Sequence, residues 1–375
     1  MKILLTGGGS GGHFYPIIAV AGELNALANE NHLLKPELYY MSTEAYNEGL
    51  LYENNIIFKQ ISTGKIRRYF SVMNFFDFFK TIIGSMKAFW TVFSIFPDVV
   101  FGKGGYASFP AILAARILRI PVVIHESDTV PGKVNAWAGK FAQKIAVSYP
   151  ESVSFFSSGK TAYTGNPVRK ELMESLSVGA YEFLKLEPNI PTILVLGGSQ
   201  GAQIINNVII DSLTELVSKY QIIHQTGKNN ILSIKETADI ILDKNPHKDR
   251  YKPFDYLNLL SMRMAAGAAD IIISRAGSTI FEIASWQKPS IIIPITNSNG
   301  DHQKKNAYAY ARTGAAIVIE EKNLSSHIVI SEIARIVEDK EEQERMKIAA
   351  GSFARKDSAR LIAEEILSIA LSHEK

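Results

Sequence analysis

The chain has 375 residues, which is too long for one ordinary hydrophobic core and fits two domains. Its composition, with 46% hydrophobic and 21% charged residues, is that of a globular protein. It contains no cysteine, which excludes a disulfide framework, a cysteine-ligated metal site and a thiol nucleophile. The apolar start, residues 1–6, is too short for a signal peptide, so we expect the protein not to be exported.

The net charge of +3 comes from the first part of the chain. Residues 1–165 carry 15 Lys and Arg against 11 Asp and Glu, whereas residues 166–375 carry 25 against 26. Around a single aspartate, Asp77, six basic residues are concentrated: Lys59, Lys65, Arg67, Arg68, Lys80 and Lys87. This basic patch is too small to indicate nucleic-acid binding, but it suits an anionic membrane surface.

Short apolar runs alternate with stretches of helical periodicity, for example at 16–28 and 110–118. In the first half the apolar runs predict strands at 2–6, 37–42, 56–61, 98–101, 121–125 and 144–147. After Gly165 the alternation starts again, with strands predicted at 192–196, 221–225, 270–273, 289–293 and 315–319. Such βα alternation is typical of parallel sheets with right-handed crossovers.

The two halves also resemble each other, because residues 3–12 and 193–201 each combine a buried strand, a glycine turn and the start of a helix. This repeat predicts an α/β protein of two doubly wound, Rossmann-like domains, residues 1–165 and 166–355, with a cleft between them. A last segment, 356–375, carries a helix at about 356–372. Its periodicity leaves open whether it packs on the second domain or crosses back to the first.

Three glycine turns join a predicted strand to a helix, at 7–12, 102–108 and 197–202. Glycine lets the backbone approach a ligand closely, and a helix that begins there directs free N–H groups at an anion. Three such turns at corresponding strand ends indicate a phosphate-containing ligand. None ends in Gly-Lys-Ser/Thr, which argues against a P-loop NTPase. The spacing of Gly7, Gly9 and Gly12 also matches the dinucleotide fingerprint, so an NAD(P) dehydrogenase stays an alternative.

A further constellation runs from Ser274 to Glu282, after a predicted buried strand. Ser278 or Thr279 is expected to cap the helix that follows and to offer N–H groups to a phosphate. Glu282 is placed to accept the hydroxyls of a ribose, although a capping acid that favours the helix dipole would look the same. The neighbouring Arg275 favours the ligand-binding interpretation.

Short motifs span nearly the whole chain: Gly7-Gly8-Gly9-Ser10-Gly11-Gly12-His13, Gly104-Gly105-Tyr106-Ala107-Ser108, His125-Glu126, Gly165-Asn166-Pro167-Val168-Arg169, Gly197-Gly198-Ser199-Gln200-Gly201-Ala202, Ser274-Arg275-Ala276-Gly277, Asp301-His302-Gln303 and Asn306-Ala307. In this order they resemble the motifs of the MurG family, the UDP-N-acetylglucosamine transferases that convert lipid I to lipid II in peptidoglycan synthesis. The chain departs from the family pattern at Ser127-Asp128, where Gln-Asn is common, and in a shorter stretch from Arg275 to Glu282.

The resemblance implies a GT-B fold whose first domain binds the lipid acceptor and a membrane, whose second domain binds the UDP-sugar, and which needs neither a metal nor another cofactor. The implied reaction moves GlcNAc, with inversion, from UDP-GlcNAc to the C4 hydroxyl of MurNAc in the polyprenyl-diphosphate-linked acceptor, lipid I. The implied donor contacts are Ser10, Gly11, Gly12, Asp128, Arg169, Ser199, Arg275, Ser278, Thr279, Glu282 and Gln303. The implied acceptor contacts are Gly9, Gly104, Gly105 and Tyr106.

Inversion by direct displacement needs a base for the acceptor hydroxyl and a group that stabilises the departing diphosphate. His13, at the tip of the first turn, is the leading candidate for the base, and Glu126 either orients it or serves instead. Arg169 or Arg275 would stabilise the diphosphate. His125 is interpreted as a buried residue at a strand end, and the eight histidines offer no pair with metal-ligand spacing, so we expect no metal site.

Residues 69–96 are unusually aromatic, and one helical face is predicted to carry Phe75, Phe79, Ile82, Met86, Phe89 and Phe93. Charged residues interrupt the stretch, so it falls short of the ~20 apolar residues of a transmembrane helix. Part of this face belongs in a hydrophobic core, and we expect the surplus aromatic residues to contact a membrane. The predicted location is the cytoplasmic face of the plasma membrane, as a peripheral protein.

Alternatives from other classes remain at this point. One is a different GT-B enzyme, either a glycolipid glycosyltransferase with a diacylglycerol acceptor or a UDP-sugar epimerase. Another is a non-catalytic subunit that only binds a UDP-sugar or recruits partners.

Overall fold

A computed structural model describes residues 1–63, 72–198, 201–296 and 298–372, with the backbone alone at 72–80 and 299. The described chain divides into two compact units. The first unit comprises Met1–Arg169 and Arg355–Lys375, and the second comprises Lys170–Ala354. The first unit is therefore built from two pieces of chain that are far apart in the sequence.

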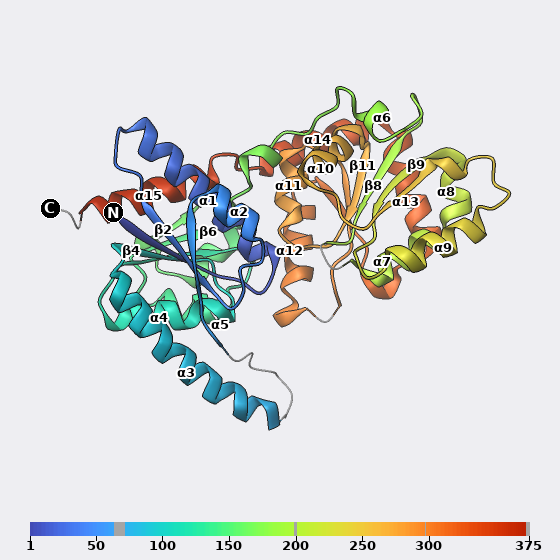
Figure 1. Cartoon of the computed structure of the whole chain (residues 1–375). Helices are drawn as coiled ribbons and strands as arrows, with labels where there is room; N and C mark the ends of the chain where they lie inside the picture. The colour runs from blue at the N-terminus through green and yellow to red at the C-terminus, as the bar shows by residue number, and fades with distance from the viewer. Residues whose placement is uncertain (64–71, 199–200, 297, 373–375) are drawn as a thin grey trace. The chain divides into compact units, whose positions relative to one another are not determined.

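The first unit contains a parallel sheet with the strand order β3-β2-β1-β4-β5-β6-β7 (Figure 1). Its strands are β1 (Lys2–Thr6), β2 (Glu37–Ser42), β3 (Ile56–Gln60), β4 (Val99–Gly102), β5 (Val122–Glu126), β6 (Lys144–Val147) and β7 (Thr161–Tyr163). The central strands β4 and β5 are buried along their whole length, as expected for a parallel sheet covered on both faces.

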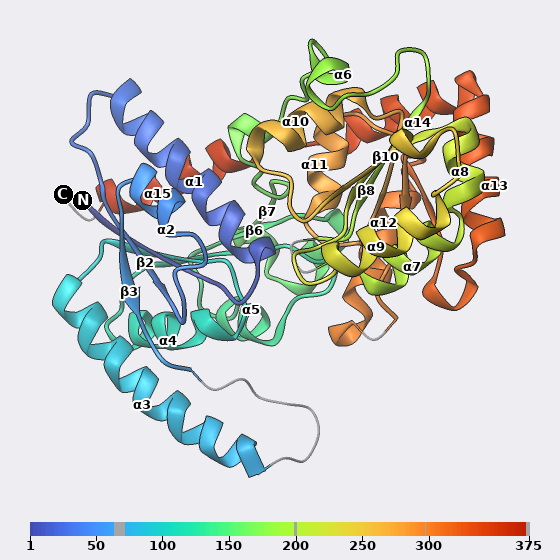
Figure 2. The ribbon, with the colours of Figure 1, turned by 45° about the vertical axis from the view of Figure 1, so that its right-hand side comes forward.

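Helices cover both faces of this sheet (Figures 1 and 2). They are α1 (Gly11–Glu30), α2 (Glu48–Glu53), α3 (Val72–Ile95), α4 (Phe109–Ile117), α5 (Lys133–Ala138) and α15 (Ser358–Ser372). Helices α1 and α15 share one hydrophobic core with β1, β2 and β4, and α3, α4 and α5 share another with β5 and β6. The last helix, whose partner the sequence left open, thus packs on α1 in the first unit.

The second unit repeats the architecture around the strand order β10-β9-β8-β11-β12-β13. Its strands are β8 (Thr192–Leu196), β9 (Gln221–Gln225), β10 (Tyr251–Phe254), β11 (Ile271–Ser274), β12 (Ser290–Ile292) and β13 (Ala316–Val318). Its helices are α6 (Ala180–Phe183), α7 (Gln203–Asp211), α8 (Leu213–Lys219), α9 (Ile231–Ile241), α10 (Leu259–Ala268), α11 (Thr279–Ser285), α12 (His302–Ala311), α13 (Ser326–Glu338) and α14 (Lys340–Phe353). Helices α7, α8, α9 and α13 form the core on one face of the sheet, while α10, α11 and α14 lie on the other (Figure 1).

The predicted strands are all present, each within one residue or so at its ends. Two strands were missed, β7 and β10, and both lie at a sheet edge. Strand β7 has only three residues, and β10 contains Pro253, which lacks the N–H that a central strand would need. Edge strands carry weaker apolar patterns because only one of their sides is paired.

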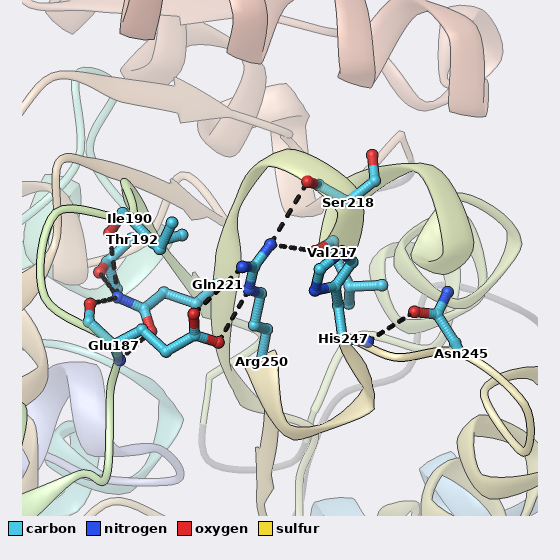
Figure 3. A network of polar contacts seen from close by, with 9 residues as sticks. All are labelled: Glu187, Ile190, Thr192, Val217, Ser218, Gln221, Asn245, His247 and Arg250. Atoms are coloured by element: carbon cyan, nitrogen blue, oxygen red, sulfur yellow. Dashed lines mark hydrogen bonds and ion pairs between the residues drawn. The ribbon is translucent and has the colours of Figure 1, made fainter.

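A polar network fixes the segment that leads into the second sheet (Figure 3). The side-chain amide of Gln221 donates to the carbonyl oxygens of Glu187 and Ile190 and to Thr192 Oγ1, at 2.9–3.1 Å, and its oxygen accepts from the N–H of Glu187. The carboxylate of Glu187 in turn forms a two-bond ion pair with Arg250, at 2.9 and 3.1 Å. The network connects the start of β8 to β9. It thereby supports the pairing of β8, the strand that leads to the glycine turn at 197–202.

Helix α3 presents only part of the predicted face to the core, because Phe89 packs against it while Ile82, Met86 and Phe93 are exposed. Its buried positions are Gly84, Ala88, Val92 and Ile95, while Ile82, Ile83, Met86, Trp90 and Phe93 are exposed. Small residues allow α3 to approach its neighbours closely, and a Cβ at Gly84 would collide with the carbonyl oxygen of Ser62. The side chains of Phe75 and Phe79 lie outside the described residues. In the part of the chain that the structure describes, no helix is both long and apolar enough to cross a bilayer.

Candidate active site

Each sheet has its topological switch point where the chain reverses the direction in which strands are added. In the first unit this is between β1 and β4, and in the second between β8 and β11. Ligands of doubly wound sheets bind outside the carboxyl ends of the strands at such points. The motifs singled out in the sequence lie there: residues 7–12 follow β1, 102–108 follow β4, 197–202 follow β8 and 275–282 follow β11.

The first two glycine turns lie against each other. Gly105 has a φ of 79°, and a Cβ there would lie 3.0 Å from the carbonyl oxygen of Gly8 and 3.5 Å from Nε2 of His13. Gly9, with a φ of 85°, is backed by the ring of Tyr106, whose Cε1 would be 3.0 Å from a Cβ. Glycine is required at both positions. Of the predicted acceptor contacts, Gly9 is exposed, Gly105 and Tyr106 are partly exposed, and Gly104 is buried.

His13 is the third residue of α1 and is partly exposed. Its Nδ1 lies 3.0 Å from Oγ of Ser10, which holds the imidazole orientation and leaves Nε2 toward Gly105. Ser10 occupies the N-cap position with extended backbone, and its side chain makes no capping hydrogen bond. Its hydroxyl is engaged with the histidine instead of with the N–H groups at the start of α1.

Glu126, at the end of β5, is 4% exposed. Its carboxylate accepts hydrogen bonds from the N–H groups of Asp128 and Gly132, each at 3.0 Å, and from Nδ2 of Asn135 at 2.9 Å. Burial raises the pKa of Glu126, the charge of Asp128 raises this pKa further, and the three hydrogen bonds act in the opposite direction. This arrangement favours a structural role, in which Glu126 holds the 126–135 loop, over the catalytic roles considered from the sequence.

Arg169 closes the Gly165–Arg169 motif, and its guanidinium lies 4.4 Å from the ring centre of Tyr15 on α1. Such a cation–π contact holds the planar group without using its hydrogen-bond donors. The buried Nε of Arg169 has no hydrogen-bond partner in the structure. A buried N–H without a partner is rare, and the Nε of Arg275 in the second unit is a second case.

Lys103, which follows β4 within the second glycine turn, was not among the residues predicted for the site. Its ammonium contacts Nδ1 of His125 at 2.6 Å, Oδ1 of Asn166 at 3.0 Å and Oγ of Ser127. His125 is completely buried, as expected, and its Nε2 lies 3.0 Å from the carbonyl oxygen of Gly165. The sequence signal for this residue is a lysine between two glycines directly after a buried strand, a position where a side chain is expected to be buried.

In the second unit Ser278, Thr279 and Glu282 are all partly exposed at the start of α11. Thr279 and Glu282 are three residues apart and so share a helical face. The expectation that Ser278 caps the helix is wrong, because its backbone is already helical and its side chain makes no capping bond. Its hydroxyl is therefore not committed to the first N–H groups of α11.

Arg275 does not point freely into this site. Its Nη1 forms a 2.7 Å ion pair with Glu321 and donates to the carbonyl oxygen of Ile293 at 3.1 Å. Both partners are mostly buried, with 14% and 11% of their side chains exposed. Glu321 also accepts from the N–H and Oγ1 of Thr296, at 2.8 and 2.5 Å. Arg275 thus stabilises the loop after β12. This contact competes with the predicted role of Arg275 in stabilising the diphosphate.

The Asp301–Ala307 motif begins α12 and lies beside that loop. Oε1 of Gln303 accepts from the N–H of Ile295 at 3.2 Å, and buried Asn306 donates to the carbonyl oxygen of Ala276 at 3.4 Å. Asn306 therefore connects α12 to the turn after β11. Ser199, a predicted donor contact, lies outside the described residues.

Among the residues that the structure describes, no three His, Asp or Glu side chains are grouped so that they could hold a metal ion. The other donor contacts, Gly11, Gly12 and Asp128, all belong to the first unit. Gly11 and Gly12 open α1, and the partly exposed Asp128 follows β5.

Comparisons with known proteins agree with this geometry. The glycosyltransferase family 28 N-terminal domain matches residues 3–147, and the glycosyltransferase family 28 C-terminal domain matches residues 192–364. The UDP-N-acetylglucosamine--N-acetylmuramyl-(pentapeptide) pyrophosphoryl-undecaprenol N-acetylglucosamine transferase of Clostridium novyi is 36% identical over 345 residues, 91% of each chain.

Two solved structures share the fold. MurG of Acinetobacter baumannii superposes with a TM-score of 0.73 at 24% identity, covering 98% of this chain and 99% of that one. A UDP-GlcNAc 2-epimerase from Neisseria meningitidis, bound to UDP-GlcNAc, superposes with a TM-score of 0.69 at 17% identity, covering 98% and 100%.

Two Rossmann-like sheets with glycine-rich turns at their switch points form a GT-B fold, and the family matches to both halves identify a UDP-sugar-dependent glycosyltransferase. The chain belongs to glycosyltransferase family 28 and, within it, to the MurG family of UDP-GlcNAc transferases. The dehydrogenase, epimerase and non-catalytic alternatives are set aside, because the relationship to a transferase extends over both halves of the chain at 36% identity.

Proposed function

We infer that this chain transfers GlcNAc from UDP-GlcNAc to the C4 hydroxyl of MurNAc in lipid I, with inversion at the anomeric carbon, and so forms lipid II. The observation that carries this inference is the 36% identity over 91% of the chain to a transferase whose name states both substrates. Radiolabelled UDP-GlcNAc, incubated with polyprenyl-diphosphate-linked MurNAc-pentapeptide, should leave label in the lipid phase. Label that stays in water, or appears in UDP-ManNAc, would contradict the assignment.

Donor binding is assigned to the second unit. The start of α11 presents Thr279 and Glu282 on one face, and Ser278 has a hydroxyl free of capping. The N–H groups of the helix and these hydroxyls suit the phosphates of UDP, and the carboxylate suits the two hydroxyls of the ribose. Gln303, fixed by its hydrogen bond to Ile295, is proposed to contact the sugar.

The departing diphosphate is assigned to Arg169 rather than to Arg275. Both arginines have a buried Nε without a hydrogen-bond partner, but Arg275 is paired with Glu321, whereas the guanidinium of Arg169 is held by the ring of Tyr15. A preorganised cation stabilises the charge that develops on the leaving group without reorganising during the reaction.

Acceptor activation is assigned to His13. The residue lies where the two glycine turns of the first unit meet, and Ser10 orients its ring. The N–H groups at the start of α1, the exposed Gly9 and the partly exposed Gly105 suit the diphosphate of the acceptor. In this arrangement the imidazole accepts the proton of the MurNAc hydroxyl as that oxygen attacks.

The exposed face of α3 is proposed to bind the cytoplasmic surface of the membrane. It presents Ile83, Met86, Trp90 and Phe93, each more than half exposed, next to the exposed Lys87. Apolar and basic side chains on one helix face are the combination that binds anionic interfaces.

A further inference from the structure

Lys103 is a buried cation that has no role in the proposed reaction. It follows β4 directly, and 1% of its surface is exposed. Its backbone N–H donates to the carbonyl oxygen of Thr6 at the end of β1, and its Cβ packs against the position of Gly7. The residue therefore lies at the switch point of the first sheet, where it belongs to the second glycine turn and contacts the start of the first.

The ammonium group has one acceptor for each of its three protons. These are Nδ1 of His125, Oγ of Ser127 and Oδ1 of Asn166. For His125 to accept at Nδ1, its proton must reside on Nε2, where the carbonyl oxygen of Gly165 lies 3.0 Å away. All three donors of a charged lysine thus have acceptors, and the carboxylates of Glu126 and Asp128 supply opposite charge.

The three acceptors belong to the segments that carry proposed donor contacts. Ser127 immediately precedes Asp128, and Asn166 lies three residues before Arg169. The network joins these two segments through one side chain. Ser127-Asp128 is also the place where this chain departs from the Gln-Asn pattern of the family.

We propose that Lys103 is a positioning residue that holds the Ser127-Asp128 loop and the Asn166–Arg169 segment in the geometry needed for the UDP-sugar. This inference rests on the proposed transferase function and deepens it. Lys103 acts through the residues that it binds and does not touch the substrate.

The charges around Lys103 bear on its protonation. Burial lowers the pKa of Lys103 to about 7, while the carboxylates of Glu126 and Asp128 act to raise it. His125 stays neutral, because burial and the charge of Lys103 lower its pKa well below the usual value; the charge of His13 on α1 lowers this pKa further. When Lys103 loses its proton, the amine can donate only two hydrogen bonds, so the Ser127 hydroxyl must turn to donate to it. The loop before Asp128 then changes its hydrogen bonding.

The test compares Lys103→Met and Ser127→Ala with the matched control Lys140→Met, which changes an exposed lysine of the same unit. A methionine fills the space without a charge, and such replacements of buried ions often leave folding intact. We expect kcat/KM for UDP-GlcNAc to fall about 10–100-fold in Lys103→Met, the range for lost hydrogen bonds to a charged group, and less in Ser127→Ala. Affinity for uridine, which lacks the diphosphate assigned to Arg169, should not change.

Two further measurements separate positioning from a general structural defect. The wild-type rate should decline as pH rises through the titration of Lys103, and this limb should disappear in Lys103→Met. Hydrogen exchange in peptides covering 126–135 and 164–169 should speed up in Lys103→Met but not in Lys140→Met. A Lys103→Met enzyme with wild-type kcat, KM, pH profile and exchange would overturn the inference. A wild-type enzyme that transfers no GlcNAc to lipid I would instead overturn the proposed function, and the exchange result alone would then decide whether Lys103 positions these segments.

Discussion

Arg275 and Glu321 form a 2.7 Å ion pair that joins the end of β11 to the segment after β13. Arg275 also holds the carbonyl oxygen of Ile293, and Glu321 holds Thr296, so the pair fixes the 293–296 loop from both sides. The same loop donates to Gln303, which we assign to the sugar. An ion pair of this kind links the stability of the second unit to its donor site.

Glu321→Gln should destabilise the second unit by roughly 1–3 kcal/mol, because Arg275 is left mostly buried without a charged partner. It should also raise KM for UDP-GlcNAc through the loosened loop. Thermal unfolding and steady-state kinetics measure the two effects. Glu332→Gln is the control, since its pair with Arg335 is exposed and worth little. Equal melting temperatures for the two variants would contradict the bracing role.

Glu282→Ala should weaken binding of UDP by about 1–3 kcal/mol, because the ribose loses hydrogen bonds to a charged acceptor. Titration calorimetry measures this directly, with Glu236→Ala as a control on an exposed helix position of the same unit. The residue is partly exposed, so folding should change little. Unchanged affinity in a folded variant would leave Glu282 as a residue that only favours the helix dipole.

His13→Ala should lower kcat by ~10²–10⁴, the usual range for loss of a general base. UDP affinity should stay the same, because we assign the nucleotide to the second unit. His327→Ala, an exposed histidine of the second unit, controls for histidine loss in general. A His13→Ala variant with normal kcat and a raised KM for lipid I would show that the imidazole binds the acceptor phosphate instead.

Replacing Ile83, Trp90 and Phe93 by Ser should reduce co-sedimentation with anionic vesicles and leave the melting temperature nearly unchanged, because all three are more than half exposed. Raised salt should weaken binding of the wild type, since the basic contribution is screened. The matched control replaces three exposed apolar residues of the second unit, Ile204, Leu232 and Ile240, by Ser. If both triple variants bind vesicles as the wild type does, α3 is not the membrane surface.

Folding stability should depend on pH through Lys103. Its pKa falls to about 7 in the folded protein, below the ordinary lysine value of 10.5, so above pH 7 the unfolded chain binds a proton that the folded chain has lost. Stability of the wild type relative to Lys103→Met should therefore rise between pH 7 and about pH 10, and the penalty for burying the charge should be largest below pH 7. Denaturant unfolding of both proteins across this range measures the difference, and a difference independent of pH would contradict the lowered pKa.

The repeated βα pattern predicted the fold well, since buried parallel strands such as 192–196 leave an unmistakable apolar run. The glycine turns were found because positive φ at Gly9 and Gly105 requires glycine whatever the neighbours are. Local patterns of this kind are visible in one sequence, because each depends on a few consecutive residues.

What the sequence could not predict were contacts between residues far apart in the chain. Nothing near Arg275 reveals that Glu321 neutralises it, and nothing near Lys103 reveals that Asn166 accepts a hydrogen bond from its ammonium group. On α3 the periodicity showed an apolar face but not its direction, because small residues such as Ala88 and Val92 took the core position and left Met86 and Phe93 outside. Which apolar stripe is buried depends on the shape of the surface that receives it.

The return of α15 to α1 has a consequence for synthesis on the ribosome. Ile362, Ile366 and Ile369 complete the core that covers α1, yet they are translated after the whole second unit. The second unit can complete its folding while the chain is still being synthesised. The first unit cannot, because part of its hydrophobic core stays exposed to solvent until α15 leaves the ribosome. A truncation before residue 355 would thus damage the amino-terminal unit, although no residue between 1 and 169 had been removed.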